Sequence, residues 1–184
     1  EIGLRPFQFC NLVEINGSNI ESQEDLNARC RAAAFIGTLQ ASYTQFHYLR
    51  EVWQSTTEKD ALLGVSITGI ASGCLDHLDL TEGAKCVNSS NKEFAGLIGI
   101  NPAARTTCVK PAGTTSCILG TSSGIHAWHN DYYIRRIRLG KNEPIYEYLS
   151  ENHSELMEDD FFKPDSQSIV SLPIKAPEGA TLRK

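Results

Sequence analysis

Apolar and polar positions near the start of the chain predict a short strand followed by a long helix. Residues 7–15 form a strand-like apolar run, which residues typical of turns end at 16–19. Ser22 stands three residues before Asp25, a spacing that resembles a capping box. From about residue 23 to 54, apolar side chains recur at spacings of three and four, which predicts one helix with a stripe packed into the core. The stripe comprises Ala32, Phe35, Ile36, Leu39, Tyr43, Phe46, Leu49 and Trp53.

Further along the chain, strand-like and helix-like segments alternate. The β-branched run between Gly64 and Gly73 predicts a buried strand, and the acidic segment 155–160 is interpreted as a solvated loop. Further strands are predicted at 105–110, 132–140 and 168–175, and helices at 81–98, from Ser116 onward and at 143–152. This alternation is typical of an α/β fold with mainly parallel strands, and nothing in the pattern indicates a separate second domain.

Composition excludes several classes of protein. The chain has 184 residues, 41% of them hydrophobic, and a formal net charge of −5. These values are typical of a globular domain and unlike those of a protein dominated by nucleic-acid binding. No apolar run approaches the roughly 18 residues of a membrane helix, so we expect neither a nucleic-acid nor a membrane partner. Because the chain opens on EIGL without an initiator methionine, we expect a piece of a longer protein.

The cysteines predict reduced thiols rather than a metal site. They stand at positions 10, 30, 74, 86, 108 and 117, without a CxxC motif or the spacing of a zinc site. A chain of this length does not need disulfides to fold. We therefore expect no metal ion, a cytoplasmic location, and cysteines that are mostly buried as small apolar residues.

A run of tyrosines and arginines, YYIRRIRLG at 132–140, combines aromatic and basic side chains. Such interleaving can bind single-stranded nucleic acid. Strand alternation instead places Ile134 and Arg136 on one face and Tyr133, Arg135 and Ile137 on the other. Because the chain is acidic overall, we interpret the run as a strand in which one arginine pairs with a carboxylate.

The segment VKPAGTTS at 109–116 has the order of a strand, a glycine turn and the start of a helix. Such a turn can direct backbone N–H groups at one point, where they bind an anion. The segment's hydroxyl groups add neutral donors, and Lys110 could add charge nearby. An ordinary turn in which threonine and serine cap a helix explains the same residues. From the residues taken by themselves, both interpretations stay open.

Three separated blocks together carry a resemblance to a known family. They are FCNLVEIN at 9–16, AAAFIGTLQASYTQFHYLR at 32–50 and KPAGTTSCILGTSSGIHAWHNDYYIRRIR at 110–138. The chain resembles class II ribonucleotide reductase, most closely the adenosylcobalamin-dependent kind that reduces ribonucleoside triphosphates and is usually monomeric. The resemblance implies an α/β fold, with 1–184 as the C-terminal portion of a ten-stranded α/β barrel. It also implies that Ala112, Gly113, Thr114, Thr115 and Ser116 hold the phosphates of the substrate.

The first ten residues match the family's catalytic segment. Its Asn-x-Cys-x-Glu motif would place the motif's glutamate at Glu1 and its asparagine and thiyl-forming cysteine upstream of the chain. The resemblance implies that Glu1 takes the proton of the ribose 3′-hydroxyl as the 2′-hydroxyl leaves as water, a general-base role. Cys10, nine residues later, matches one member of the cysteine pair that reduces the substrate, with its partner upstream. Adenosylcobalamin, a ribonucleoside triphosphate and thioredoxin or a similar dithiol are the implied cofactor, substrate and reductant.

Two alternatives remain at this stage. One is the large subunit of a class I reductase, which uses diphosphate substrates and a tyrosyl radical on a partner. The other is a non-catalytic half of a split reductase that works only after assembly with its other half. Without the thiyl-forming cysteine, the chain is expected to be inactive when tested alone.

Overall fold

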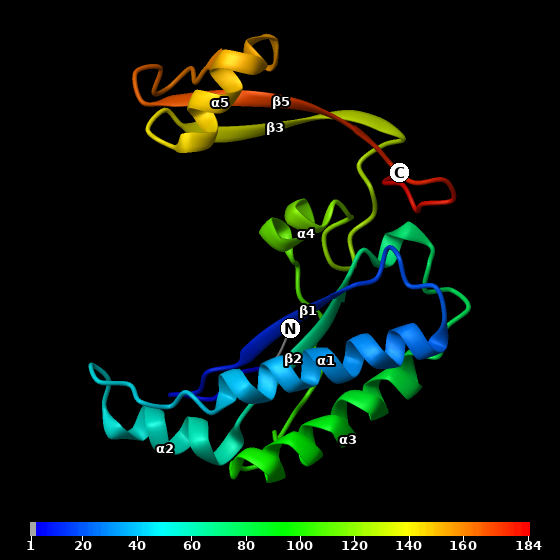
Figure 1. Cartoon of the computed structure of the whole chain (residues 1–184), viewed down its shortest axis with the longest axis vertical. Helices are drawn as coiled ribbons and strands as arrows, with labels where there is room; N and C mark the ends of the chain where they lie inside the picture. The colour runs from blue at the N-terminus through cyan, green and yellow to red at the C-terminus, as the bar shows by residue number, and fades with distance from the viewer. Residues whose placement is uncertain (1–2) are drawn as a thin grey trace. The chain divides into compact units, whose positions relative to one another are not determined.

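The computed structural model describes residues 3–184, which form two compact units. Unit 1 comprises residues 3–128 with 179–181, and unit 2 comprises 129–178 with 182–184. Each unit has its own sheet, and each is described separately below (Figure 1). Between residues 3 and 184, no helix is long and apolar enough to cross a membrane.

Unit 1 is built on the parallel pair β1 (Asn11–Asn16) and β2 (Leu63–Thr68). Their register runs from Asn11 opposite Leu63 to Asn16 opposite Thr68. Helices α1 (Gln23–Ala41) and α3 (Leu80–Ile98) lie side by side on one side of this pair, and Figure 1 shows the short helix α4 (Gly113–Leu119) on the other. The predicted buried strand and second helix are therefore confirmed, whereas the first strand begins at 11 rather than 7.

The core of unit 1 lies between the sheet and α1 and α3. Alternation along the strands turns odd-numbered residues toward the helices, so that a Cβ on Gly37 of α1 would contact Leu63 and Val13. The helix buries small side chains, including Ala33 and Ala34, against this sheet face. The predicted core stripe is wrong, because most of its large members are exposed: Phe35, Ile36, Leu39, Tyr43 and Leu49 are 40–71% accessible.

The predicted single helix from 23 to 54 is also wrong, because the chain breaks between α1 and α2 (Glu51–Asp60). Aromatic side chains in and after the break contact Phe9. Its ring lies 5.1 Å from that of Phe46 and stacks on Trp53 at 4.8 Å, measured between centroids.

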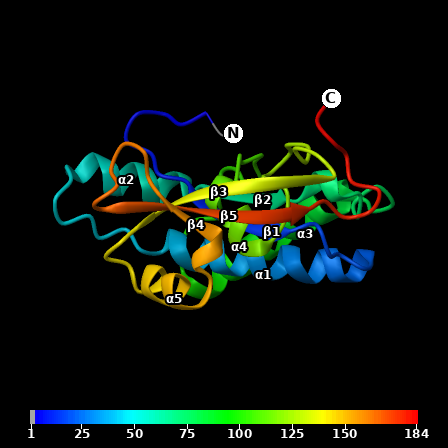
Figure 2. The ribbon, with the colours of Figure 1, turned by 90° about the horizontal axis from the view of Figure 1, so that it is seen from above.

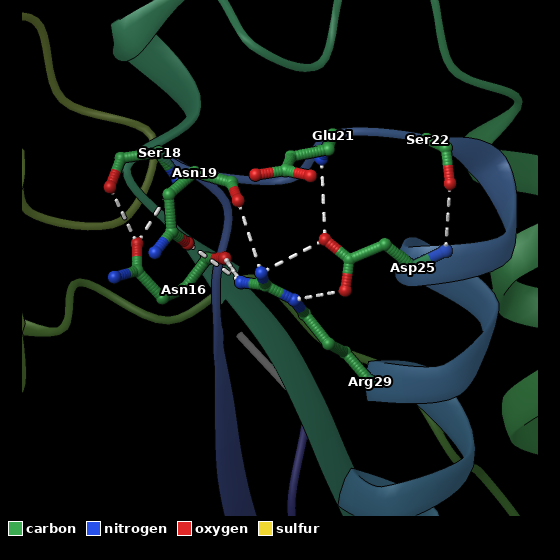
Figure 3. A network of polar contacts seen from close by, with 7 residues as sticks. All are labelled: Asn16, Ser18, Asn19, Glu21, Ser22, Asp25 and Arg29. Atoms are coloured by element: carbon green, nitrogen blue, oxygen red, sulfur yellow. Dashed lines mark hydrogen bonds and ion pairs between the residues drawn. The ribbon is translucent and has the colours of Figure 1, made fainter.

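A polar network holds the carboxyl end of β1 to the start of α1 (Figure 3). Arg29 donates to the carbonyl oxygens of Asn16 and Asn19 and forms an ion pair with Asp25 at 2.8 Å. The N-cap hydroxyl of Ser22 accepts from the Asp25 backbone N–H, which confirms the predicted helix start. The hydrogen bond from Arg29 lowers the pKa of Asp25. This guanidinium therefore fixes the turn after β1.

The segment 105–110, predicted as a strand, lies alongside β2 and hydrogen-bonds to it, but it does not form a regular strand. The backbone N–H groups of Leu63 and Val65 donate to the carbonyls of Arg105 and Thr106, and the described chain has an isolated parallel bridge between Val65 and Thr107. Pro111 follows directly and has no backbone N–H with which to continue the ladder. Helix α4 then begins at Gly113, three residues earlier than predicted.

Unit 2 is an antiparallel sheet in the order β3 (Tyr132–Gly140), β5 (Gln167–Lys175), β4 (Met157–Asp159). Figure 2 shows β3 and β5 running side by side, and β3 is followed by α5 (Pro144–Asn152) and the short helix η2 (Ser154–Leu156). The predicted strands and helix here are confirmed, but the expectation of mainly parallel strands holds for unit 1 alone.

The acidic segment of unit 2 is not the solvated loop that its composition predicts. Part of it forms β4, and Asp160 is buried, with 2% accessibility. Its carboxylate accepts from Arg138 at 2.7 Å and from the backbone N–H groups of Phe162 and Lys163. An internal carboxylate thus organises the turn that precedes β5.

Candidate functional site

The sheet face of unit 1 that points away from α1 and α3 bears the candidate chemistry. Strand alternation places Cys10, Leu12 and Glu14 on this face, beside Gly64 and Ser66 of β2. Two contacts support the assignment: Glu14 pairs with Lys110, and the Lys110 backbone N–H donates to the hydroxyl of Ser66 at 3.1 Å. We call this surface the site face.

Cys10 lies half-buried on the site face, next to Cys108. A Cβ on Gly64 would lie 3.0 Å from the sulfur of Cys10 and 2.9 Å from that of Cys108, so the two sulfurs are no farther apart than the sum of these distances. Burial, with a smaller contribution from Cys108, raises the pKa of Cys10 to about 11. Burial likewise raises the pKa of Cys108. At neutral pH, Cys10 is therefore a thiol rather than a thiolate.

Glu14 and Lys110 form an ion pair across the site face. The Lys110 Nζ lies 3.0 Å from Oε2 of Glu14, whose side chain is 3% accessible, against 22% for the lysine side chain. Oε1 of the same carboxylate is buried and has no hydrogen-bond partner among the described residues. No signal in the sequence indicates Glu14, because an acidic residue in an alternating strand is equally compatible with a solvated face.

Residues 112–116, which we call the phosphate loop because they are the predicted phosphate-binding residues, adopt a strained turn at the start of α4. Ala112, the N-cap, is buried with a φ of 46°, in the left-handed region that non-glycine residues rarely occupy. The N–H groups of Gly113, Thr114 and Thr115 are the first of the helix and have no intrahelical acceptor. Ser116 differs, because its N–H donates to the carbonyl of Ala112, its hydroxyl donates to that of Gly113, and its side chain is buried. The donors available for an anion are thus those of 113–115.

A second loop, at 121–124, holds the phosphate loop at the carboxyl end of β2. The hydroxyl of Thr68 donates to the carbonyl of Ser122 at 3.1 Å and accepts from the N–H of Gly124 at 2.8 Å. Gly124 has a φ of 53° and approaches the carbonyl of Lys110 so closely that a Cβ would overlap it. The hydroxyl of Ser123 donates to the carbonyl of Pro111. The carboxyl ends of parallel strands are where α/β proteins bind ligands.

The structure places Cys10 and the phosphate loop on the same side of the sheet, away from α1 and α3. Glu1, the predicted general base, lies outside the described residues. Lys110, predicted as a source of charge for the loop, is paired with Glu14. The expectation that most cysteines are buried is wrong: Cys30 is buried, Cys10, Cys74, Cys86 and Cys108 are partly accessible, and Cys117 is exposed.

In unit 2, the arginines of β3 contact other side chains. Arg138 pairs with Asp160, Arg136 with Glu158, and Arg135 donates to the hydroxyl of Tyr133 at 3.2 Å. The prediction that one arginine of this strand pairs with a carboxylate is therefore confirmed. The guanidinium groups stabilise the sheet rather than forming a free basic patch.

Comparisons with known proteins agree on one group of enzymes. No family model matches the chain. A probable adenosylcobalamin-dependent ribonucleoside-triphosphate reductase of Dictyostelium discoideum is 28% identical over 96% of the chain and 23% of its own length. The reductase of the same name from Euglena gracilis is 27% identical over 96% of the chain and 24% of its length. That of Lactobacillus acidophilus is 28% identical over 82% of the chain and 24% of its length.

A solved structure shows the same fold. The crystal structure of a B12-dependent class II ribonucleotide reductase superposes with a TM-score of 0.77 at 21% identity, covering 98% of this chain and 30% of that one. The expected α/β fold is thereby confirmed. The chain spans about a quarter of the length of the curated relatives that it matches. In sequence and in fold, the chain is similar to one segment of the adenosylcobalamin-dependent, class II ribonucleotide reductases.

Proposed function

We propose that residues 1–184 form the C-terminal portion of the catalytic barrel of an adenosylcobalamin-dependent reductase. This enzyme would convert ribonucleoside triphosphates into their 2′-deoxy forms for DNA precursor synthesis. Similarity to reductases of that name along 96% of the chain supports the proposal. The structural observation on which it depends is that Cys10 and the phosphate loop share one side of the sheet.

Each candidate residue has a distinct task in this proposal. The N–H groups of Gly113, Thr114 and Thr115 hold the phosphates of the substrate, while Ala112 and Ser116 shape the turn that presents them. Glu1 accepts the proton of the 3′-hydroxyl. Cys10 supplies reducing equivalents to the sugar as one member of a dithiol that closes to a disulfide.

The cofactor proposal depends on the names of the relatives. Adenosylcobalamin would supply the radical that starts the reaction. The apolar cavity of unit 1, about 180 Å³ and lined by residues such as Ile15, Val65 and Val87, is smaller than a corrin ring with its nucleotide tail. These residues do not fit the cofactor, and we assign no cobalamin contact in this chain.

The remaining partner assignments follow from the same proposal. Thioredoxin or a similar dithiol would re-reduce Cys10 and its upstream partner, and the complete enzyme would act as a monomer in the cytoplasm. No nucleic-acid partner is proposed, since Arg136 and Arg138 already pair with carboxylates. No membrane partner is proposed either.

The test is an assay of the reductase that contains this chain, with adenosylcobalamin, ATP and reduced thioredoxin, in which dATP is quantified by chromatography. We expect Cys10→Ser to abolish multiple turnovers. The matched control is Cys86→Ser, at a partly accessible position on α3, which should retain wild-type rates. The isolated 184-residue chain should form no dATP. Sustained turnover by the Cys10→Ser enzyme would overturn the role of this thiol, and turnover without cobalamin would overturn the proposed class.

A further inference from the structure

The ion pair between Glu14 and Lys110 is the least expected feature of the site face. It joins residues 96 positions apart, at an Nζ–Oε2 distance of 3.0 Å. The carboxylate is 3% accessible and its second oxygen has no partner among the described residues. A buried carboxylate with one unsatisfied oxygen is costly, and removing its one cation would be costlier. A pair of this kind at a ligand site therefore calls for a functional explanation.

The two partners differ in their freedom to move. Glu14 projects from β1, whose backbone is fixed by its ladder with β2. Lys110 precedes the phosphate loop and has a 22% accessible side chain at the end of a flexible four-carbon stem. The lysine can therefore leave the carboxylate, whereas the carboxylate cannot follow it.

Lys110 also lies close to the anion donors of the loop. Gly113 stands three positions further along the chain, so the two Cα atoms lie at most about 11 Å apart even when the chain is fully extended. Its backbone is held from two sides, by the hydroxyl of Ser66 and by the close approach of Gly124. The backbone that carries the Lys110 ammonium group is therefore held in place beside the loop.

We propose that Lys110 is a phosphate-binding residue and that Glu14 competes with the bound nucleotide for its ammonium group. The proposal rests on the proposed function, since the ligand is the triphosphate of that substrate. In the structure, Glu14 holds Lys110. When a triphosphate occupies the N–H groups of 113–115, the ammonium exchanges the carboxylate for a phosphate oxygen. Binding then includes the cost of leaving Glu14 without its cation, which lowers affinity and favours release.

The competition predicts opposite effects for the two partners, measured by isothermal titration of the 184-residue chain with inorganic tripolyphosphate and with ATP. Lys110→Met should weaken binding about tenfold or more, because a charge-assisted hydrogen bond is lost. Glu14→Gln should tighten binding several-fold, because the lysine is released to the ligand. Lys110→Arg should retain most of the affinity. Circular dichroism melts verify that each variant is folded.

The matched control is the ion pair of Arg31 and Glu93, whose side chains are about half exposed. Arg31→Met and Glu93→Gln should leave affinity unchanged.

If the wild-type chain binds neither ligand, the phosphate role of the loop fails and the inference fails with it. If it binds and both Glu14→Gln and Lys110→Met weaken binding, the pair is structural and the inference alone is overturned. Should Glu14→Gln fail to fold, equal affinities of Lys110→Met and wild type would still overturn it.

Discussion

At the scale of single residues, the environment of Cys10 determines its chemistry. Burial raises its pKa to about 11, and the neighbouring thiol of Cys108 adds to the shift. The Cys10 thiol is thereby kept protonated at neutral pH. The sequence motif predicts a redox role for Cys10, whereas its protonation depends on contacts with segments about 50 and 100 residues away.

The raised pKa predicts how alkylation of Cys10 depends on pH. The reactive species is the thiolate, whose fraction grows about tenfold per pH unit below the pKa. Labelling by iodoacetamide, followed by peptide mass spectrometry, should therefore be slow at pH 7 and accelerate up to about pH 11. Labelling of exposed Cys117 in the same sample is the internal reference. Rapid labelling of Cys10 at pH 7 would contradict the buried thiol.

Asp160 gives a second prediction at this scale. The hydrogen bond from Arg138, with those from the N–H groups of Phe162 and Lys163, lowers its pKa below the ordinary 3.8. A lowered folded-state pKa means that the carboxylate stabilises the fold above its unfolded pKa, and that this contribution is lost as pH falls through the folded value. The amide NMR signals of Phe162 and Lys163 should titrate below pH 3.8 and lose this transition in Asp160→Asn. A midpoint at or above 3.8 would contradict the arrangement.

At the scale of elements, predictions based on periodicity succeeded where an element's own sequence decides its limits. The second helix is an example: Asp79 caps its start and Gly99, with a φ of 77°, ends it. The helix predicted from 23 to 54 is wrong between α1 and α2, where Phe46 and Trp53 contact Phe9, a partner that no local pattern of the segment encodes. The Glu14–Lys110 pair was missed for the same reason, since it joins two segments that only the folded sheet brings together.

Strand β2 requires glycine at position 64. A Cβ there would lie 2.5 Å from Leu12 and within 3.0 Å of the sulfurs of Cys10 and Cys108. Gly64→Ala should therefore destabilise the chain by about 1–3 kcal/mol through overpacking. Gly96→Ala is the matched control, because nothing lies within 4 Å of its Cβ position on α3. It should stabilise the chain by roughly 0.5–1 kcal/mol. Urea unfolding of both variants measures the change in their free energy of unfolding, and equal changes would refute the prediction.

At the scale of the whole molecule, apolar burial is unequal between the units. The hydrophobic cluster of the described chain, which includes Leu26, Leu63 and Val87, lies entirely in unit 1. In unit 2, Val170 and Ala176 are the buried apolar residues among those described. Large side chains such as Phe161 and Phe162 are 80–89% exposed there. Because apolar burial is the main favourable contribution to folding, unit 2 should have the lower local stability.

Hydrogen–deuterium exchange can measure this difference along the chain. Amides of β3 and β5 should exchange through local opening, faster than those of β2 and α3, although both sets are hydrogen-bonded in sheets or helices. Amides of β2 should show the greatest protection, because this strand has backbone partners on both sides, in β1 and in the 105–108 segment. Mass spectrometry of peptic peptides at pH 7 resolves the two sets. Equal protection would mean that the units unfold as one, and that contacts beyond the core of unit 1 stabilise the antiparallel sheet.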